Sequence, residues 1–119
     1  MQDYRKLSVW EKAHRLVVDL NKVTKNYPKE ELFVLTSQIR RAAISIPSNI
    51  AEGCGRKSKT EFLRFLDIAF GSANELEYQI FLSFELEYIS NESFENLNHR
   101  MDVIKKMLSG LMQKISKSI

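Results

Sequence analysis

The sequence contains few of the residues that make tight turns or covalent cross-links. Its 119 residues include only four glycines, two prolines and one cysteine. Glycine and proline supply much of the chemistry of tight turns, so their scarcity excludes a sandwich or barrel of many short strands and favours a few long elements. The single cysteine, Cys54, excludes an intramolecular disulfide framework and suits a reducing compartment.

Long hydrophobic runs are also missing. The longest uncharged stretch covers only residues 42–51, whereas a helix needs about 20 apolar residues to span a bilayer. The charged N-terminal residues are not followed by the apolar segment of a secretory signal. We therefore expect a soluble, cytoplasmic protein of one domain, residues 1–119, that makes no membrane contact.

The charged residues are separated along the chain. Residues 1–27 carry six bases and three acids, whereas residues 65–99 carry seven acids and neither lysine nor arginine. Basic residues dominate in residues 56–64 and again in residues 100–119. Charges that are separated in this way can steer an anionic partner toward the protein, and they can equally match one subunit to another. The overall net charge of +3 leaves both interpretations open.

Apolar residues recur at helical spacing through almost the whole chain. Ser8 and Glu11 have the spacing of a capping box, in which both side chains bond to free N–H groups of the first turn. Ser58 and Glu61 repeat this spacing further along the chain. Four helices joined by short turns predict an all-α fold, an antiparallel up-down-up-down four-helix bundle. The predicted helices cover residues 9–27, 29–53, 59–87 and 91–117.

The second helix is predicted from an apolar stripe that starts at Leu32 and continues in phase across Pro47. Pro28 separates it from the first helix, because the residue before a proline avoids the α region. The unbroken phase favours one kinked helix over two separate ones. We expect this helix to end at Gly53 or Gly55, because glycine commonly follows the last turn of a helix.

The third helix carries more apolar surface than the core of a simple bundle requires. Apolar residues on its flanks, together with others on the second helix, are candidates for an interface between identical subunits. A wide core contact inside one subunit is the alternative explanation. The candidate interface residues are Phe33, Ile44, Leu63, Phe70, Phe81, Phe84 and Tyr88.

No residue pattern indicates an enzyme. Cys54 has no neighbouring base in the sequence that would activate its thiol. Glu11 and His14 match half of a carboxylate-bridged metal site, but the second Glu-x-x-His of such a site is missing. We therefore expect no catalytic residue, no metal and no cofactor.

A basic cluster marks the turn between the second and third helices. Phosphate contacts need lysine or arginine on an exposed ridge, and the N-terminus of the third helix also favours anions. The cluster is a candidate nucleic-acid-binding site, and an ordinary solvated surface is the alternative. Its members are Arg56, Lys57, Lys59 and Arg64.

Two segments carry a resemblance to a known family. Residues 40–53 have the sequence Arg-Arg-Ala-Ala-Ile-Ser-Ile-Pro-Ser-Asn-Ile-Ala-Glu-Gly, and the motif Gly71-Ser-Ala-x-Glu75 follows later. With these motifs the chain resembles the four-helix bundle family named after proteins encoded in intervening sequences of bacterial large-subunit ribosomal RNA genes. The signature residues are Arg40, Arg41, Ser45, Pro47, Asn49, Glu52, Gly53, Gly71, Ser72 and Glu75.

That family is similar in turn to the accessory variability proteins of diversity-generating retroelements. The resemblance implies a barrel-like homo-oligomer, a pentamer of four-helix subunits. In the retroelement branch it also implies binding of nucleic acid, RNA or DNA, and of a reverse transcriptase. We therefore expect a non-enzymatic, nucleic-acid-binding accessory protein. The alternative is a structural or protein-interaction scaffold.

Several signature residues also have structural explanations. Glu75 or Glu77 of the third helix can pair with an arginine of the antiparallel second helix, either Arg40 or Arg41. Small residues allow these two helices to approach closely. The small residues in question are Ala42, Ala43, Ala69, Gly71, Ser72 and Ala73.

Overall fold

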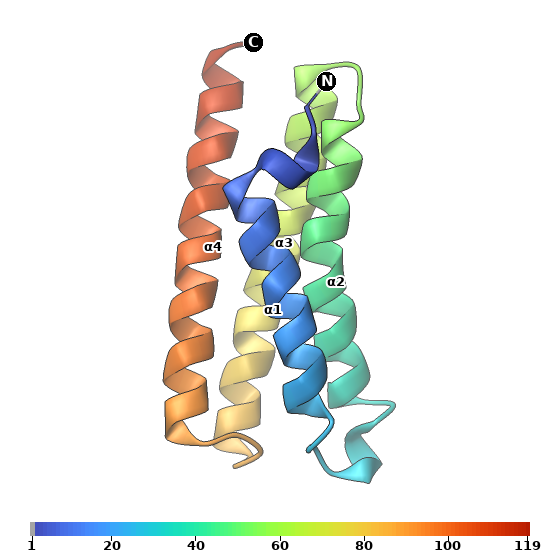
Figure 1. Ribbon diagram of the computed structural model, residues 1–119, viewed down its shortest axis with the longest axis vertical. Coiled ribbons are helices and arrows are strands. Elements are labelled where there is room, and N and C mark those ends of the chain that lie inside the picture. Colours follow the sequence, from blue (N-terminus) through green and yellow to red (C-terminus); the bar gives the residue numbers. More distant parts are fainter. Residues whose placement is uncertain (1) are drawn as a thin grey trace.

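The computed structural model describes residues 2–119 and consists of four long helices and two short 3₁₀ turns. Successive long helices run in opposite directions, and residues 2–119 contain no strand (Figure 1). The predicted all-α four-helix bundle is confirmed. The helices are α1 (Ser8–Thr24), α2 (Leu35–Cys54), α3 (Lys59–Glu85) and α4 (Asn91–Lys117), and the 3₁₀ turns are η1 (Tyr4–Lys6) and η2 (Lys29–Glu31).

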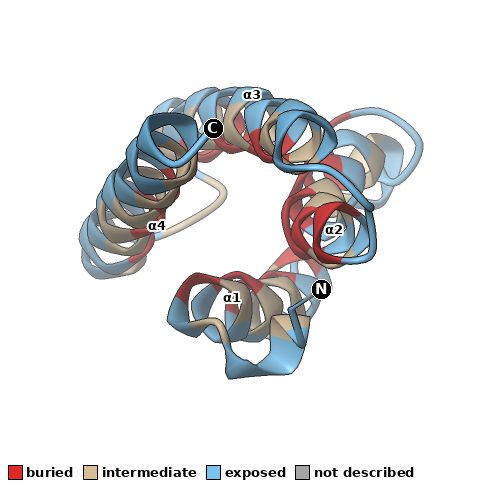
Figure 2. Ribbon diagram, turned by 90° about the horizontal axis from the view of Figure 1, so that it is seen from above, coloured by how far each residue is buried: buried red, intermediate tan, exposed pale blue. Residues whose placement is uncertain are grey.

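Each long helix turns its apolar stripe toward the centre of the bundle, where the buried residues gather (Figure 2). Removing this apolar surface from water is the main favourable term in folding, at about 25 cal/mol per Å². Apart from Leu32, the core lies where the helical periodicity of the sequence predicts it. Its largest fully buried side chains are Leu16, Leu20, Thr36, Ile39, Ile46, Ile50, Leu66, Leu76, Ile80, Met101, Ile104 and Leu108.

The predicted capping box at Ser8 is wrong. The chain enters α1 from η1, so Leu7 occupies the cap position and Ser8 already belongs to the helix. Asp3 caps η1 instead, and its carboxylate accepts a hydrogen bond from the backbone N–H of Arg5 at 3.0 Å. At its other end α1 stops at Thr24, before the predicted limit, and the chain turns toward η2.

The predicted start of the second helix is also wrong. Residues 29–31 form η2, and α2 begins only at Leu35. Val34 separates the two, because its φ of −119° and ψ of −98° lie outside the helical region. Leu32, expected in the core, is 45% exposed, and Phe33 next to it is 88% exposed. The chain between η2 and α2 therefore presents apolar side chains to solvent.

The limits of α2 and α3 at their shared turn agree with prediction. Pro47 is buried inside α2, and the helix continues through it as one element. α2 ends at Cys54, although Gly55 has a φ of −85° and does not adopt the left-handed conformation. Ser58 caps α3, and its Oγ accepts a hydrogen bond from the N–H of Glu61 at 3.1 Å.

α2 and α3 share the most extensive contact between any two helices of the bundle. Gly53 lies against the first turns of α3. A Cβ atom at this position would be 2.8 Å from Cδ1 of Phe62 and 3.0 Å from Cβ of Phe65. Gly53 is therefore required by the close approach of the two helices, and its conformational freedom is not involved.

A polar contact joins α2 and α3 further along. The hydroxyl of Ser72 donates a hydrogen bond to Oγ of Ser45 at 2.7 Å. The side-chain amide of Asn49 donates to the backbone carbonyl of Ser45 at 2.7 Å, one turn away on α2. Ser45, Asn49 and Ser72 thus form a small hydrogen-bonded group at the seam, which explains these signature residues structurally.

Gly71 does not take part in this helix contact. It is exposed on α3, and no atom lies within 4 Å of where its Cβ would be. The expectation that its small size serves the approach of α2 and α3 is therefore wrong within one subunit.

The expected pairing of the α2 arginines with the α3 carboxylates is wrong as well. Arg40 faces α1, where its Nε donates to Oγ1 of Thr24 at 3.0 Å. Glu77 faces α4 and pairs with Lys105 at 3.1 Å. These groups lie on faces of α2 and α3 that point away from each other, which helical spacing alone did not decide.

The other two residues of the expected pairing, Arg41 and Glu75, make no ion pair across the α2–α3 seam. Arg41 is exposed on α2. Glu75 accepts a hydrogen bond from the amide of Gln79, one turn further along α3, at 3.2 Å.

The end of the bundle opposite the two termini is held together by Tyr88. Its hydroxyl donates to Oε2 of Glu31 at 2.7 Å, and its ring centre lies 5.3 Å from that of Tyr27. The hydrogen bond to Glu31 raises the pKa of Tyr88, because ionisation would bring two negative charges together. Tyr88 therefore ties the α3–α4 turn to the connection between α1 and α2.

Gly53→Ala is expected to lower the free energy of unfolding by about 1–3 kcal/mol, because the added methyl group must displace Phe62 or Phe65. Gly110→Ala in α4 is the matched control, because no atom lies within 4 Å of where its Cβ would be. It adds the same group to open space within a helix, so it is expected to raise the free energy of unfolding by about 0.5–1 kcal/mol. Urea unfolding followed by circular dichroism measures both changes. A Gly53→Ala protein as stable as the wild type would contradict the close approach of α2 and α3.

Tyr88→Phe is expected to make the protein less sensitive to alkaline pH. The raised pKa of Tyr88 means that its hydrogen bond stabilises the protein below the ordinary tyrosine pKa of about 10 and is lost as the pH rises above it. The free energy of unfolding of the wild type should therefore fall more steeply than that of the variant between about pH 9 and pH 11. Urea titrations across this range test the difference, and parallel curves would refute it.

Candidate functional site

One end of the bundle brings basic residues together from distant parts of the sequence. The N-terminus, the α2–α3 turn and the C-terminus all lie at this end (Figure 1). A pocket of about 280 Å³ is lined there by residues from all three segments, among them Gln2, Lys57 and Ile115. We call this end of the bundle the basic end. Its basic residues are Arg56, Lys57, Lys59, Lys114 and Lys117.

Arg56 is held in place by two neighbours. Its guanidinium pairs with the carboxylate of Glu52, one turn back, at 2.6 Å and lies 4.7 Å from the ring centre of Phe65. An exposed ion pair of this kind contributes little stability. The side chain of Arg56 remains 41% exposed, so its other N–H groups are available to a ligand. Glu52 nevertheless reduces the positive charge of the predicted cluster.

Lys57 and Lys59 are both exposed on the same turn. The ammonium of Lys59 donates to the backbone carbonyl of Ser118 at 3.2 Å, which ties the turn to the end of α4. Lys57 makes no ion pair within residues 2–119. These two lysines and Arg56 line one pocket, so the structure brings three of the four predicted basic residues together.

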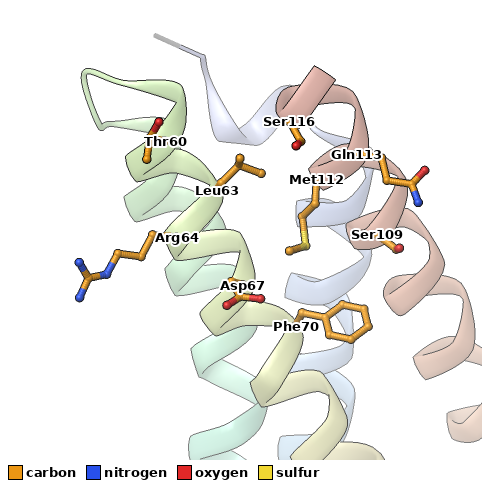
Figure 3. Close-up of a pocket in the computed structure, with 9 residues that line it drawn as sticks. All are labelled: Thr60, Leu63, Arg64, Asp67, Phe70, Ser109, Met112, Gln113 and Ser116. Carbon is orange, nitrogen blue, oxygen red and sulfur yellow. The ribbon is translucent and has the colours of Figure 1, made fainter. Parts of the chain in front are cut away.

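Arg64 is separated from the other three. It lies further along α3, and its side chain points away from the neighbouring helix α4 (Figure 3). It is exposed to solvent but does not line the pocket at the basic end.

Sequence reasoning missed the contribution of α4. Lys114 and Lys117 lie in its last turn, and the residue after that turn, Ser118, is hydrogen-bonded to Lys59, although more than fifty residues separate the two lysines from Lys59 in the sequence. The only available signal was the excess of bases in residues 100–119. The antiparallel course of the helices is what brings the end of α4 beside Lys59.

The opposite end of the bundle has the opposite charge. It comprises the α1–α2 connection, the α3–α4 turn and the adjoining helix ends (Figure 1). Carboxylates outnumber lysines there. The acidic residues are Glu30, Glu31, Glu85, Glu87 and Glu92, and the basic residues are Lys22, Lys25 and Lys29. We call this the acidic end. The charge of the bundle is therefore polarised along its length.

A groove between α3 and α4 contains two of the predicted interface residues. Leu63 and Phe70 line it from α3, and Met112 faces them from α4 (Figure 3). Its volume is about 700 Å³, and Arg64 and Asp67 stand at its edge. The groove leaves part of this apolar surface uncovered within one subunit.

The other predicted interface residues are scattered. Phe84 stacks on Phe94 at a ring-centre distance of 4.5 Å, and Tyr88 packs on Tyr27, so both make their contacts inside the subunit. Phe81 is 47% exposed on α3, close to the acidic end. Phe33 and Ile44 are exposed on the α1–α2 connection and on α2.

A further apolar face of α3 was not included among the interface residues. Ile68 and Tyr78 are 46% and 60% exposed, and the open Gly71 lies between them. Residues 68, 71, 75, 78 and 82 are spaced at three and four, so they share one side of the helix. At Gly71, no other part of the subunit covers this side of α3.

Cys54 and His14, which were considered for catalysis and for metal binding, pack against other side chains of the bundle. Cys54 is buried, and burial raises the pKa of its thiol, which opposes formation of the reactive thiolate. His14 stacks on the indole of Trp10 at 5.0 Å. Within residues 2–119, no three histidine, cysteine or acidic side chains are grouped as metal ligands. None of the described helices is both long enough and apolar enough to cross a membrane.

Comparison with known proteins identifies relatives. No similar sequence is found among proteins of curated function. A crystal structure of a protein of unknown function from the S23 ribosomal protein family of Bacteroides thetaiotaomicron is 32% identical, covering 88% of this chain and 95% of the other, with a TM-score of 0.81. The family model described as 23S rRNA-intervening sequence protein matches residues 5–110. Since this match spans most of the bundle, the chain belongs to the 23S rRNA-intervening sequence protein family.

Proposed function

We propose that the protein is a non-enzymatic, self-associating helical bundle that binds nucleic acid through its basic end. The polarisation of the bundle carries this proposal. Arg56, Lys57 and Lys59 lie at the same end of the bundle as Lys114 and Lys117 in the last turn of α4, while carboxylates outnumber lysines at the other end. Such a field orients the basic end toward a polyanion and repels the opposite end from it.

The exposed lysines suit contacts to phosphate rather than to bases. Lysine ammonium groups neutralise phosphate without reading sequence, and binding of this kind releases counterions and weakens with salt. Arg56 is stacked on Phe65, so this aromatic ring is not available to a nucleic-acid base. We therefore expect binding with little sequence preference.

Self-association would multiply a weak site. A few phosphate contacts per subunit give low affinity, but linked copies raise the effective concentration of sites along one strand. The unpartnered apolar side of α3 and the α3–α4 groove support an interface between copies of the chain. A pentamer is the assembly that we propose, in line with the family resemblance of the sequence.

A scaffold without nucleic-acid binding is the second candidate function. The ion pair between Arg56 and Glu52 favours it, because this pair satisfies one of the predicted phosphate-binding groups inside the subunit. The two oppositely charged ends could then serve to match neighbouring subunits.

The triple variant Arg56→Ala, Lys57→Ala and Lys59→Ala tests the binding proposal. The wild type should bind RNA and DNA oligonucleotides that lack terminal phosphates, with a log–log salt slope of about −2 to −3 for three phosphate contacts per subunit. The triple variant should bind much more weakly and with a shallower slope. Fluorescence anisotropy at two salt concentrations measures both quantities.

The matched control removes three charges from the acidic end, by Lys22→Ala, Lys25→Ala and Lys29→Ala. These lysines are exposed as well, so the net charge changes equally while the basic end stays intact. The control should bind nucleic acid about as tightly as the wild type does, whereas the triple variant of the basic end should not. Equal loss in both variants, or no salt-sensitive binding by the wild type, would favour the scaffold.

Self-association is tested separately by light scattering at micromolar concentration. The wild type should have a mass several times that of one chain. Ile68→Glu and Phe81→Glu each place a charge on an exposed apolar face of α3, and desolvating that charge should dissociate an assembly that uses the face. Gln38→Glu, at an exposed polar position of α2, is the control. A monomeric wild type would contradict the proposal.

A further inference from the structure

A second group of basic side chains lies on the flank of the bundle, between α1 and α4. α1 has 17 residues and α4 has 27, and these two helices have the weakest contact of the neighbouring helix pairs. A pocket of about 260 Å³ opens between them. It is lined by Lys12 and Arg15 of α1 and by His99, Arg100, Val103 and Ile104 of α4.

Helical spacing explains why these side chains converge. Lys12 and Arg15 are three residues apart and share one side of α1. Arg100 and Val103 have the same spacing on α4, and Ile104 is buried beside them. The pocket therefore combines an apolar floor with a rim of nitrogen donors from two helices.

Positive charge in this pocket is only partly balanced. Asp19 pairs with Arg100 at 3.0 Å, and the side chain of Arg100 is only 25% exposed. Neither Lys12 nor Arg15 makes an ion pair within residues 2–119. Leaving His99 aside, three cationic groups face one carboxylate, so two positive charges are in excess. An anion bound among them would relieve their mutual repulsion.

We infer that this pocket binds a phosphate group in its doubly charged form, as inorganic phosphate or as a phosphate monoester. The second pKa of a phosphate monoester is about 6 and that of inorganic phosphate is about 7, so at pH 8 both carry a charge close to −2, which balances the excess. Arginine presents paired N–H donors that match phosphate oxygens, and lysine adds a point charge. A phosphodiester carries a single charge and balances the pocket only by half.

The partners in this pocket differ from those at the basic end. Its residues belong to the middle of α1 and of α4, whereas the basic end is built from the α2–α3 turn and the last turn of α4. The inference therefore does not depend on the proposed binding of nucleic acid.

Isothermal titration with inorganic phosphate at pH 8, where the doubly charged form dominates, tests the inference on the full chain. We expect saturable binding by the wild type, and at least about tenfold weaker binding by the double variant Lys12→Ala and Arg15→Ala. Both residues are exposed, so the double variant should keep its helical circular dichroism. The variant Lys57→Ala and Lys59→Ala removes the same charge from the basic end and should bind phosphate as the wild type does.

A second measurement keeps the test independent of the double variant. In the wild type, phosphate should shift the NMR signals of the His99 ring and leave those of His14 unchanged, because only His99 lines the pocket. No saturable binding of phosphate, or equal binding by the wild type and the double variant, would overturn the inference. Shifts at His14 alone would do so too.

Further titrations distinguish the source of the phosphate. Adenosine 5′-monophosphate is compared with adenosine, and a 5′-phosphorylated oligonucleotide with the same oligonucleotide ending in a hydroxyl group. Tighter binding of the monophosphate than of inorganic phosphate supports a nucleotide ligand. A gain that needs the phosphorylated strand supports a strand end, and equal affinity for all phosphate-bearing ligands supports free phosphate. Each gain should disappear in the Lys12→Ala and Arg15→Ala variant.

Discussion

The close packing of α2 against α3 is the constraint on which the rest of the structure depends. Gly53 allows Phe62 and Phe65 to lie directly on α2, at distances where any Cβ atom would collide. The turn between the two helices is therefore short and held at both ends. Because Arg56 stacks on Phe65, the packing that joins the helices also positions the first basic residue of the candidate site.

The unequal lengths of the helices shape both ends and one flank. α1 is the shortest of the four, so the connection from α1 to α2 has to include η2 and an extended turn before α2 begins. Tyr88 closes this region through Glu31. On the flank, the short α1 leaves a weak contact with α4, and the basic pocket lies in that seam.

Both proposals depend on the charge distribution of the bundle, but they concern different sites. Segments that are basic in sequence come together at one end of the bundle and along the α1–α4 seam, and acidic segments come together at the other end. At the basic end the side chains are exposed, which suits a polyanion of variable sequence. In the seam they surround a pocket with an apolar floor, which suits a single compact anion.

The sequence by itself determined the number and type of the elements, because burial of one apolar stripe per helix imposes a period that is visible in the residues. The core positions, the cap at Ser58 and the passage of α2 through Pro47 followed from local chemistry. The cap expected at Ser8 and the start expected at residue 29 did not hold, since η1 and Val34 set the backbone before those helices begin.

Only the tertiary structure decided which charged groups meet. Helical spacing places a side chain on a face but does not say which neighbour that face contacts, so Arg40 bonds to Thr24 and Glu77 to Lys105 rather than to each other. The same limit applies to the sites. Lys114 joins the basic end, and Lys12 faces Arg100, because antiparallel packing brings residues together that lie far apart in the chain.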